Sequence, residues 1–165
     1  MQVVRGEGVV LEPQVVAHAA QLYPLLSDPE LYHYMDGKPA DEAAFRVRLG
    51  KLETRLSGDG SEDWLNWVVR DDAGTMVGYV QATVYRNGLA EVAWVIGTAF
   101  QRRGHARAAT LAMLDELAVT YSVNRVRGQA DAGNIASIRL MERMGFRPIP
   151  DLEVQPDVVY EKTLP

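Results

Sequence analysis

The chain of 165 residues contains no cysteine. This absence excludes a disulfide framework, a thiolate metal site and a cysteine nucleophile, and it is typical of proteins from a reducing compartment. The N-terminus lacks the basic start and long apolar run of a signal peptide, and no later stretch is as long as a membrane span. We therefore expect a cytoplasmic protein that does not enter a membrane.

Two common phosphate-binding motifs are also missing. The nucleotide P-loop needs Gly-x-x-x-x-Gly-Lys followed by Ser or Thr, and no such run occurs. The dinucleotide fingerprint needs three spaced glycines after the first strand of a parallel unit, whereas Gly104 stands nearly alone. His18 and His33 have no spacing typical of a metal site or a catalytic triad, so we predict no metal.

What the chain does contain is typical of a folded domain. Hydrophobic residues make up 47% of the sequence and charged residues 24%, which predicts one globular domain spanning residues 1–165. The formal net charge of −5 argues against general nucleic-acid binding and gives a weak indication of cationic substrates.

Hydrophobic periodicity and turn residues predict the order β-α-α-β-β-β-α-β-α-β-β. The β-branched segment 3–13 is taken as one strand around a Gly-Glu-Gly turn. The breaks "DAG" and "RNG" have hairpin length, so the three strands that they separate should be antiparallel. The expected helices cover 14–27, 41–56, 104–121 and 134–144, and the expected later strands cover 64–71, 75–85, 89–97, 124–131 and a β-rich tail at 154–164.

The segment "VIGTAFQRRGHARAATLAML" (Val95 to Leu114) places a cationic turn between a strand and a helix. Helix N-termini present unpaired N–H groups and the positive end of the helix dipole, so they bind phosphates. Gly104 would let the main chain approach such a ligand, while Arg102, Arg103 and Arg107 would add positive charge. The alternative is a glycine that only permits a sharp turn, beside solvated surface arginines.

Two motifs resemble the GNAT family of N-acetyltransferases. "QRRGHA" (Gln101 to Ala106) resembles the family's pyrophosphate loop, with Ala106 where many members have a second glycine. "NIASIRLMERMGFRP" (Asn134 to Pro148) is similar to the family's helix that begins with Asn and ends in Gly-Phe. The start of the chain loosely resembles the branch that includes ribosomal-protein N-terminal acetyltransferases. The resemblance implies a mixed α/β fold with a mostly antiparallel sheet flanked by helices, and acetyl-CoA as cosubstrate.

The resemblance also implies which residues hold acetyl-CoA, in a cleft where two strands separate. Main-chain groups of one strand would meet the pantetheine arm and the acetyl carbonyl, and Asn134 would hydrogen-bond the pantetheine amides or simply cap its helix. The side chains on that strand are expected to pack in the core. The implied set is Trp94, Val95, Ile96, Arg102, Arg103, Gly104, His105, Ala106, Arg107 and Asn134.

The catalytic groups depart from the family pattern. Met141 stands where many members have a tyrosine acid, and Gln129 stands where some members have a glutamate base. Ser137 could contact the sulfur or the pantetheine, or be a surface serine. Glu91 is the only carboxylate on "LAEVAWVIG"; strand alternation could point it toward the cleft with partial burial, as a base, or leave it as an exposed edge charge.

These observations predict direct transfer of acetyl from acetyl-CoA to a primary amine in a ternary complex. The acceptor would be an amine-bearing small molecule or a protein N-terminus, and a homodimer is compatible with the sequence. The rival hypothesis is a non-catalytic acyl-CoA-binding module. An aromatic and amide cluster falls where the family builds its acceptor pocket, although core packing is the more common role for aromatics: Tyr32, Tyr34, Met35, Trp64, Asn66 and Trp67.

Overall fold

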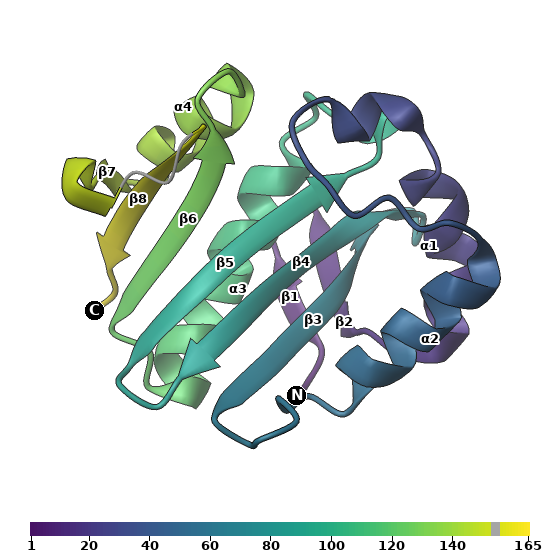
Figure 1. Cartoon of the computed structure of the whole chain (residues 1–165), viewed down its shortest axis with the longest axis horizontal. Helices are drawn as coiled ribbons and strands as arrows, with labels where there is room; N and C mark the ends of the chain where they lie inside the picture. The colour runs from purple at the N-terminus through teal and green to yellow at the C-terminus, as the bar shows by residue number, and fades with distance from the viewer. Residues whose placement is uncertain (153–155) are drawn as a thin grey trace.

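The computed structural model describes residues 1–152 and 156–165, and the described chain builds one eight-stranded sheet (Figure 1). The strand order is β1-β2-β3-β4-β5-β6-β8-β7, and all neighbours are antiparallel except β5 and β6. The strands are β1 (Val4–Gly6), β2 (Val9–Pro13), β3 (Glu62–Asp71), β4 (Met76–Tyr85), β5 (Leu89–Ile96), β6 (Arg125–Asp131), β7 (Arg147–Pro148) and β8 (Asp157–Thr163).

Within the part of the chain that the structure describes, four α-helices and four short 3₁₀ turns connect these strands. The helices are α1 (Ala19–Leu26), α2 (Glu42–Glu53), α3 (His105–Tyr121) and α4 (Ile135–Arg143). The 3₁₀ turns are η1 (Val16–His18), η2 (Pro29–His33), η3 (Thr98–Phe100) and η4 (Pro150–Leu152). None of the described helices is both long and apolar enough to cross a membrane.

The predicted mixed α/β fold is confirmed, including the antiparallel meander β3-β4-β5. Segment 3–13 differs from the prediction of one strand. It forms the hairpin β1-β2, because Gly8 adopts a left-handed φ of 69° and reverses the chain. The first predicted helix begins later than expected, at Ala19 after η1. The predicted tail becomes β8, and its first two residues, Val154 and Gln155, lie outside the described residues.

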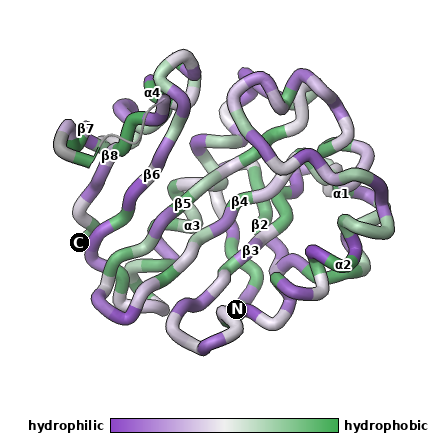
Figure 2. The backbone as a smooth tube through the Cα atoms, in the orientation of Figure 1, coloured by the Kyte–Doolittle hydropathy of each residue, from purple (hydrophilic) through white to green (hydrophobic). Residues whose placement is uncertain are grey.

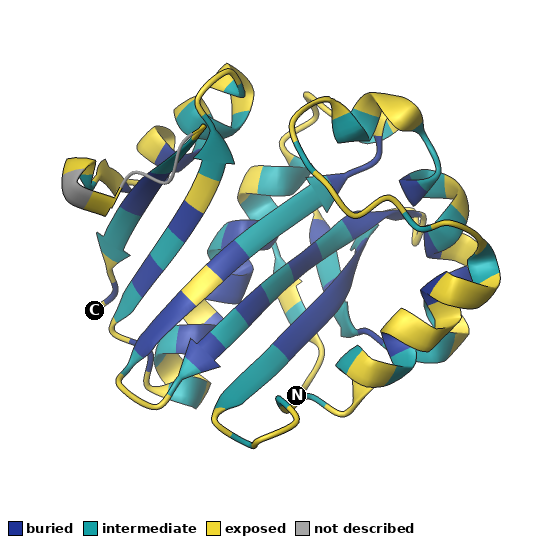
Figure 3. Ribbon diagram, viewed as in Figure 1, coloured by how far each residue is buried: buried dark blue, intermediate teal, exposed yellow. Residues whose placement is uncertain are grey.

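Two apolar clusters cover the two faces of the sheet. The larger joins β2–β6 to α3 and α4 through residues such as Trp67, Met113 and Phe146. The smaller joins α1 and α2 to the other face through residues such as Leu22 and Phe45. Hydrophobic segments accordingly concentrate in the central strands and α3 (Figure 2), and the same strands are the most buried part of the sheet (Figure 3).

The strands β5 and β6 pair only along their first halves (Figure 1). The paired positions run from Leu89 and Arg125 to Val92 and Gly128, after which the two strands separate. A Cβ on Gly128 would lie 2.8 Å from the sulfur of Met141, so this glycine lets α4 pack closely against β6. The second half of β5 is therefore left with an open edge in the middle of the sheet.

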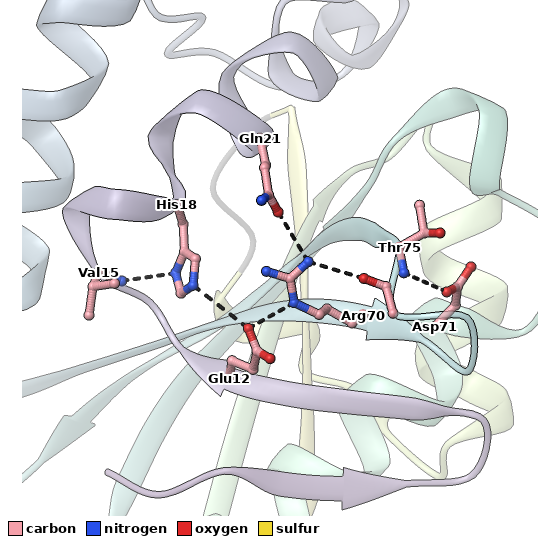
Figure 4. A network of polar contacts seen from close by, with 8 residues as sticks. Glu12, Val15, His18, Gln21, Arg70, Asp71 and Thr75 are labelled. Atoms are coloured by element: carbon pink, nitrogen blue, oxygen red, sulfur yellow. Dashed lines mark hydrogen bonds and ion pairs between the residues drawn. The ribbon is translucent and has the colours of Figure 1, made fainter.

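A polar network anchors the start of α1 to the sheet (Figure 4). Glu12 on β2 forms an ion pair of 2.8 Å with Arg70 on β3, and His18 Nε2 lies 3.7 Å from the same carboxylate. The Nδ1 atom of His18 accepts a hydrogen bond from the main-chain N–H of Val15. Burial lowers the pKa of His18, with Arg70 acting in the same direction and the carboxylate of Glu12 opposing. The network therefore favours the neutral imidazole of His18.

Candidate functional site

The open edge of β5 presents the main-chain groups of Trp94 and Ile96. The N–H of Gly97 donates to the carbonyl of Val77 on β4 at 2.9 Å, so the adjoining carbonyl of Ile96 points away from β4. Strand alternation then directs Trp94 toward the opening and Val95 toward β4, where it pairs with Tyr79. The main-chain role predicted for Val95 therefore does not fit, because its N–H and C=O groups point toward β4 and belong to the β4–β5 pairing. For Trp94 and Ile96, on either side of Val95, the main-chain role stays a prediction.

The loop after β5 is built around two left-handed residues. Gly104 has a φ of 87°, and Arg102, which carries a side chain, has a φ of 61°. The side-chain amide of Gln101 donates to the carbonyl of Ile96 at 3.0 Å and so ties the loop to the open edge. Gln101 belongs to the predicted loop motif, although the motif alone assigns its side chain no role. The loop thus arrives at α3 in a fixed position beside the opening.

Among the described residues, no side chain caps the N–H groups at the N-terminus of α3. Its first residue outside the helix, Gly104, makes no side-chain cap, and the first turn contains no acidic residue. By contrast, Asp41 caps α2 and Asn134 caps α4. A Cβ added at Gly104 would meet no atom within 4 Å, so the space in front of the helix end is open. This arrangement suits an anion.

The other predicted residues of this loop lie around the N-terminus of α3 and differ in exposure. Arg102, Arg103 and Arg107 are exposed, whereas His105 and Ala106 are half-buried. His105 Nδ1 lies 3.2 Å from the carbonyl of Phe100, and this contact requires Nδ1 to donate its proton. His105 therefore braces the loop from within, and the three arginines supply the positive charge.

A second helix end faces the opening from the other side. Asn134 Oδ1 accepts a hydrogen bond from the main-chain N–H of Ser137 at 3.2 Å and caps α4. The ring of Tyr34, in the connection between α1 and α2, lies against Gly133 just before this cap. Thr98 of η3 donates a hydrogen bond to Asp28 in the same connection. The α1–α2 connection is therefore fastened to both sides of the opening.

The side chains at the two departures from the family pattern are both engaged elsewhere in the fold. Met141 is fully buried in the larger core cluster, with its sulfur against Gly128. Gln129 is exposed and donates to the carboxylate of Asp157 on β8 at 2.6 Å. Neither position offers an acid or a base.

Glu91 lies on the face of β5 that also carries Ala93 and Val95, beside Thr83 of β4 and Arg127 of β6. Its side chain is exposed, as in the second of the two alternatives predicted for it, and not partly buried. Burial raises the pKa of Tyr85, and the carboxylate of Glu91 beside its hydroxyl adds to this rise. The exposed carboxylate of Glu91 thus lies within reach of water and of the Tyr85 hydroxyl.

The predicted aromatic cluster is divided by the sheet. Trp67 is fully buried on the α3 face, and its indole N–H donates to the carbonyl of Gln2. Trp64 and Asn66 lie on the α1/α2 face and line two adjoining hollows. Other polar residues of these hollows were not predicted, because they come from three segments that are separate in the sequence, the turn after β2, the helix α2 and the strand β4: Gln14, Arg48, Tyr79, Gln81 and Thr83.

No cluster of three or more potential metal ligands occurs among the described residues. A family model described as an acetyltransferase (GNAT) domain matches residues 9–147. No curated protein sequence matches the chain.

Three solved structures share the fold. A GNAT-family acetyltransferase from Bacillus anthracis has a TM-score of 0.80 at 17% identity, over 98% of each chain. RimL, a ribosomal L7/L12 alpha-N-protein acetyltransferase in complex with coenzyme A, has a TM-score of 0.83 at 15% identity, also over 98% of each chain. A ribosomal-protein-S5-alanine acetyltransferase from Vibrio fischeri has a TM-score of 0.79 at 15% identity, over 98% of this chain and 96% of the other.

Proposed function

The chain belongs to the GNAT family of acetyltransferases, and we propose that it transfers the acetyl group of acetyl-CoA directly to a primary amine in a ternary complex. The observation that carries the proposal is the uncapped N-terminus of α3 beside the open edge of β5. The N-terminus of α3 suits the diphosphate of acetyl-CoA. The open edge of β5 offers unpaired main-chain groups to the amide-bearing pantetheine arm.

The described residues fit such a cosubstrate. The main chain of Gly104 and the first turn of α3 would hold the pyrophosphate, with Arg102, Arg103 and Arg107 nearby. The main chain of Trp94 and Ile96 and the free amide nitrogen of Asn134 would hold the pantetheine. When bound, acetyl-CoA supplies a thioester whose carbonyl carbon is open to attack by an amine.

The chain's own residues would stabilise the charge that develops during transfer and accept the proton of the amine. A main-chain N–H on the open edge would stabilise the charge that develops on the carbonyl oxygen. The amine nitrogen forms the new C–N bond as the C–S bond breaks, and Glu91 would accept the amine proton through water. The Ser137 hydroxyl would donate a hydrogen bond to the departing sulfur, which finally takes a proton from solvent.

The function can be tested by mixing the protein with acetyl-CoA and a panel of small primary amines and peptides. Because the chain has no cysteine, a thiol reagent reports only released coenzyme A. We expect release that depends on the acceptor, and an acetylated amine in the mass spectrum. Intact protein incubated without amine should gain no acetyl group if the transfer is direct.

Two outcomes would contradict parts of this proposal. Tight acetyl-CoA binding with no turnover over the whole panel would favour the rival, a non-catalytic acyl-CoA-binding module. An acetylated protein that forms without amine, and transfers its acetyl when amine is added, would replace the ternary complex with an acyl-enzyme.

A further inference from the structure

Three exposed arginines, Arg102, Arg103 and Arg107, form a positive patch around the N-terminus of α3. Within the described residues, none of them forms an ion pair, whereas four other arginines each pair with a carboxylate. The sequence has no Asp or Glu between Glu91 and Asp115, although the whole chain has a formal net charge of −5. The patch is therefore a local concentration of positive charge on an acidic protein.

The positive charge of this patch exceeds what a diphosphate requires. The main-chain N–H groups of Gly104 and of the first turn of α3, which no side chain caps, can hold the two phosphates of the diphosphate. Coenzyme A carries a further phosphate, a monoester on the 3′ oxygen of its ribose, with a charge of about −1.5 to −2 near neutral pH. Because the ribose separates this monoester from the diphosphate, a side chain that binds it must lie beside the helix end.

Arg103 is the member of the patch whose guanidinium lies over an aromatic ring. Its Cζ is 5.9 Å from the centre of the Phe100 ring, which is the range of a cation–π contact. Phe100 is held in place, because its ring packs against the larger core cluster and its N–H donates to the carbonyl of Gly97 at 2.8 Å. The contact turns the side chain of Arg103 back over η3 and so places its charge beside the end of α3.

We propose that Arg103 binds the 3′-phosphate of coenzyme A and so makes the chain select coenzyme A over dephospho-coenzyme A, which lacks that phosphate. This inference rests on the proposed function and names a specificity residue of its cosubstrate site. A guanidinium suits the monoester because two of its N–H donors can bind two phosphate oxygens at once. The contact with Phe100 holds the group in one region without using those donors.

The test compares coenzyme A with dephospho-coenzyme A by calorimetry on the parent protein. Both ligands carry the same diphosphate and pantetheine, so the ratio of their Kd values reports the 3′-phosphate alone. We expect coenzyme A to bind roughly tenfold more tightly, which lies between the effect of an exposed ion pair and that of a strong charged hydrogen bond. Added salt should reduce the ratio, because it screens exposed charges.

Three variants assign the ratio to this side chain, once circular dichroism has shown that each is folded. Arg103→Ala should weaken coenzyme A binding and leave dephospho-coenzyme A binding nearly unchanged, so that the two ligands bind alike. Arg103→Lys keeps a charge without the paired donors and should restore part of the ratio. Phe100→Leu keeps an apolar side chain without the ring and should lower the ratio by a few fold.

Arg102→Ala is the matched control for Arg103→Ala. Arg102 belongs to the same loop and is also exposed, but it lies over no aromatic ring among the described residues. Its loss removes the same charge from the patch, so it should weaken the binding of both ligands by a similar factor and leave the ratio of their Kd values as in the parent.

The results distinguish this inference from the proposed function. Equal Kd values for the two ligands, or a ratio that survives in Arg103→Ala, would overturn the role of Arg103 while the acetyltransferase stands. If the ratio is found and depends on Arg103 but no amine is acetylated, the inference stands and the proposed transfer fails. If neither ligand binds the folded protein, the cosubstrate site is wrong and the inference fails with it.

Discussion

The side-chain oxygen of Asn134 accepts a hydrogen bond of 3.2 Å from the main-chain N–H of Ser137. This bond occupies the oxygen and leaves the amide nitrogen of Asn134 to donate elsewhere. The Ser137 side chain takes no part in the cap. The two residues therefore have separable roles, one in stability and one toward a ligand.

Asn134→Asp keeps the cap oxygen but replaces the free N–H donor with a second carboxylate oxygen. Since Asp caps helices as well as Asn does, the free energy of unfolding should stay within about 0.5 kcal/mol of the parent. Acetyl-CoA affinity should fall by roughly tenfold or more, because a donor is lost and a charge is added. Calorimetry and denaturant titration measure the two effects. Unchanged affinity would leave Asn134 with the cap role alone.

Ser137→Ala removes only the hydroxyl, because the cap uses the main chain. We expect unchanged stability and acetyl-CoA affinity, with the transfer rate lowered roughly tenfold if the hydroxyl supports the departing sulfur. Single-turnover rates give the chemical step directly. A rate equal to that of the parent would identify Ser137 as a surface serine of α4.

The sequence was sufficient for the fold because its signals are local. Turn glycines at Gly74 and Gly88 separate the meander strands, and Asp41 and Asn134 mark helix starts. The same local signals located the loop at Gly104. The direction of the main-chain groups of Val95 could not be predicted, because it depends on the register with β4, which no local pattern records. Arg48 was not predicted, because the other residues that line its hollow come from segments distant in the sequence.

Two substitutions of Gly104 distinguish the effect of backbone strain from the effect of blocking the ligand. Gly104→Val places a β-branched side chain at a φ of 87°, which costs roughly 1–3 kcal/mol and fills the space before α3. Gly104→Asn adds a side chain that tolerates left-handed backbone, so it should fold nearly as well as the parent. Both variants should bind acetyl-CoA much more weakly than the parent, by roughly 100-fold in the valine variant.

Arg102→Ala is the comparison for charge at the same loop. It removes one exposed guanidinium and should weaken acetyl-CoA binding by less than about tenfold. Calorimetry on folded samples ranks the three variants. If Gly104→Asn bound acetyl-CoA like the parent, the phosphate would not approach the main chain at this glycine.

His18 makes stability depend on pH below neutrality. Its pKa is lowered in the folded protein, so the unfolded chain binds the proton more readily. Stability should therefore be full above pH of about 6.5 and decline as the pH falls below that value. Protonation at Nδ1 would also break the bond from Val15. Denaturant midpoints at pH 7.5 and pH 5 measure the decline.

His18→Asn is the control for this effect. Its side-chain oxygen can accept the same main-chain N–H but does not titrate, so the variant should lose less stability than the parent between the two pH values. The carboxylates titrate in both proteins and cancel in the comparison. An identical loss in parent and variant would assign the decline to Glu12 or Glu53 instead.

Glu91 is the carboxylate that β5 offers on the α1/α2 face, and the exposure of its side chain means that water can carry a proton to it. An amine acceptor is mostly protonated at neutral pH, so its proton must leave before attack. If Glu91 accepts that proton, Glu91→Gln should lower the transfer rate by roughly 10²–10⁴-fold with acetyl-CoA affinity nearly intact.

Glu161→Gln is the matched control for Glu91→Gln. Glu161 pairs at 2.8 Å with Arg127, the neighbour of Glu91 on β6, without facing β5. Removing that charge should change the rate by only a few fold. A pH–rate profile in which Glu91→Gln kept the parent rate and its acidic limb would leave solvent as the proton acceptor.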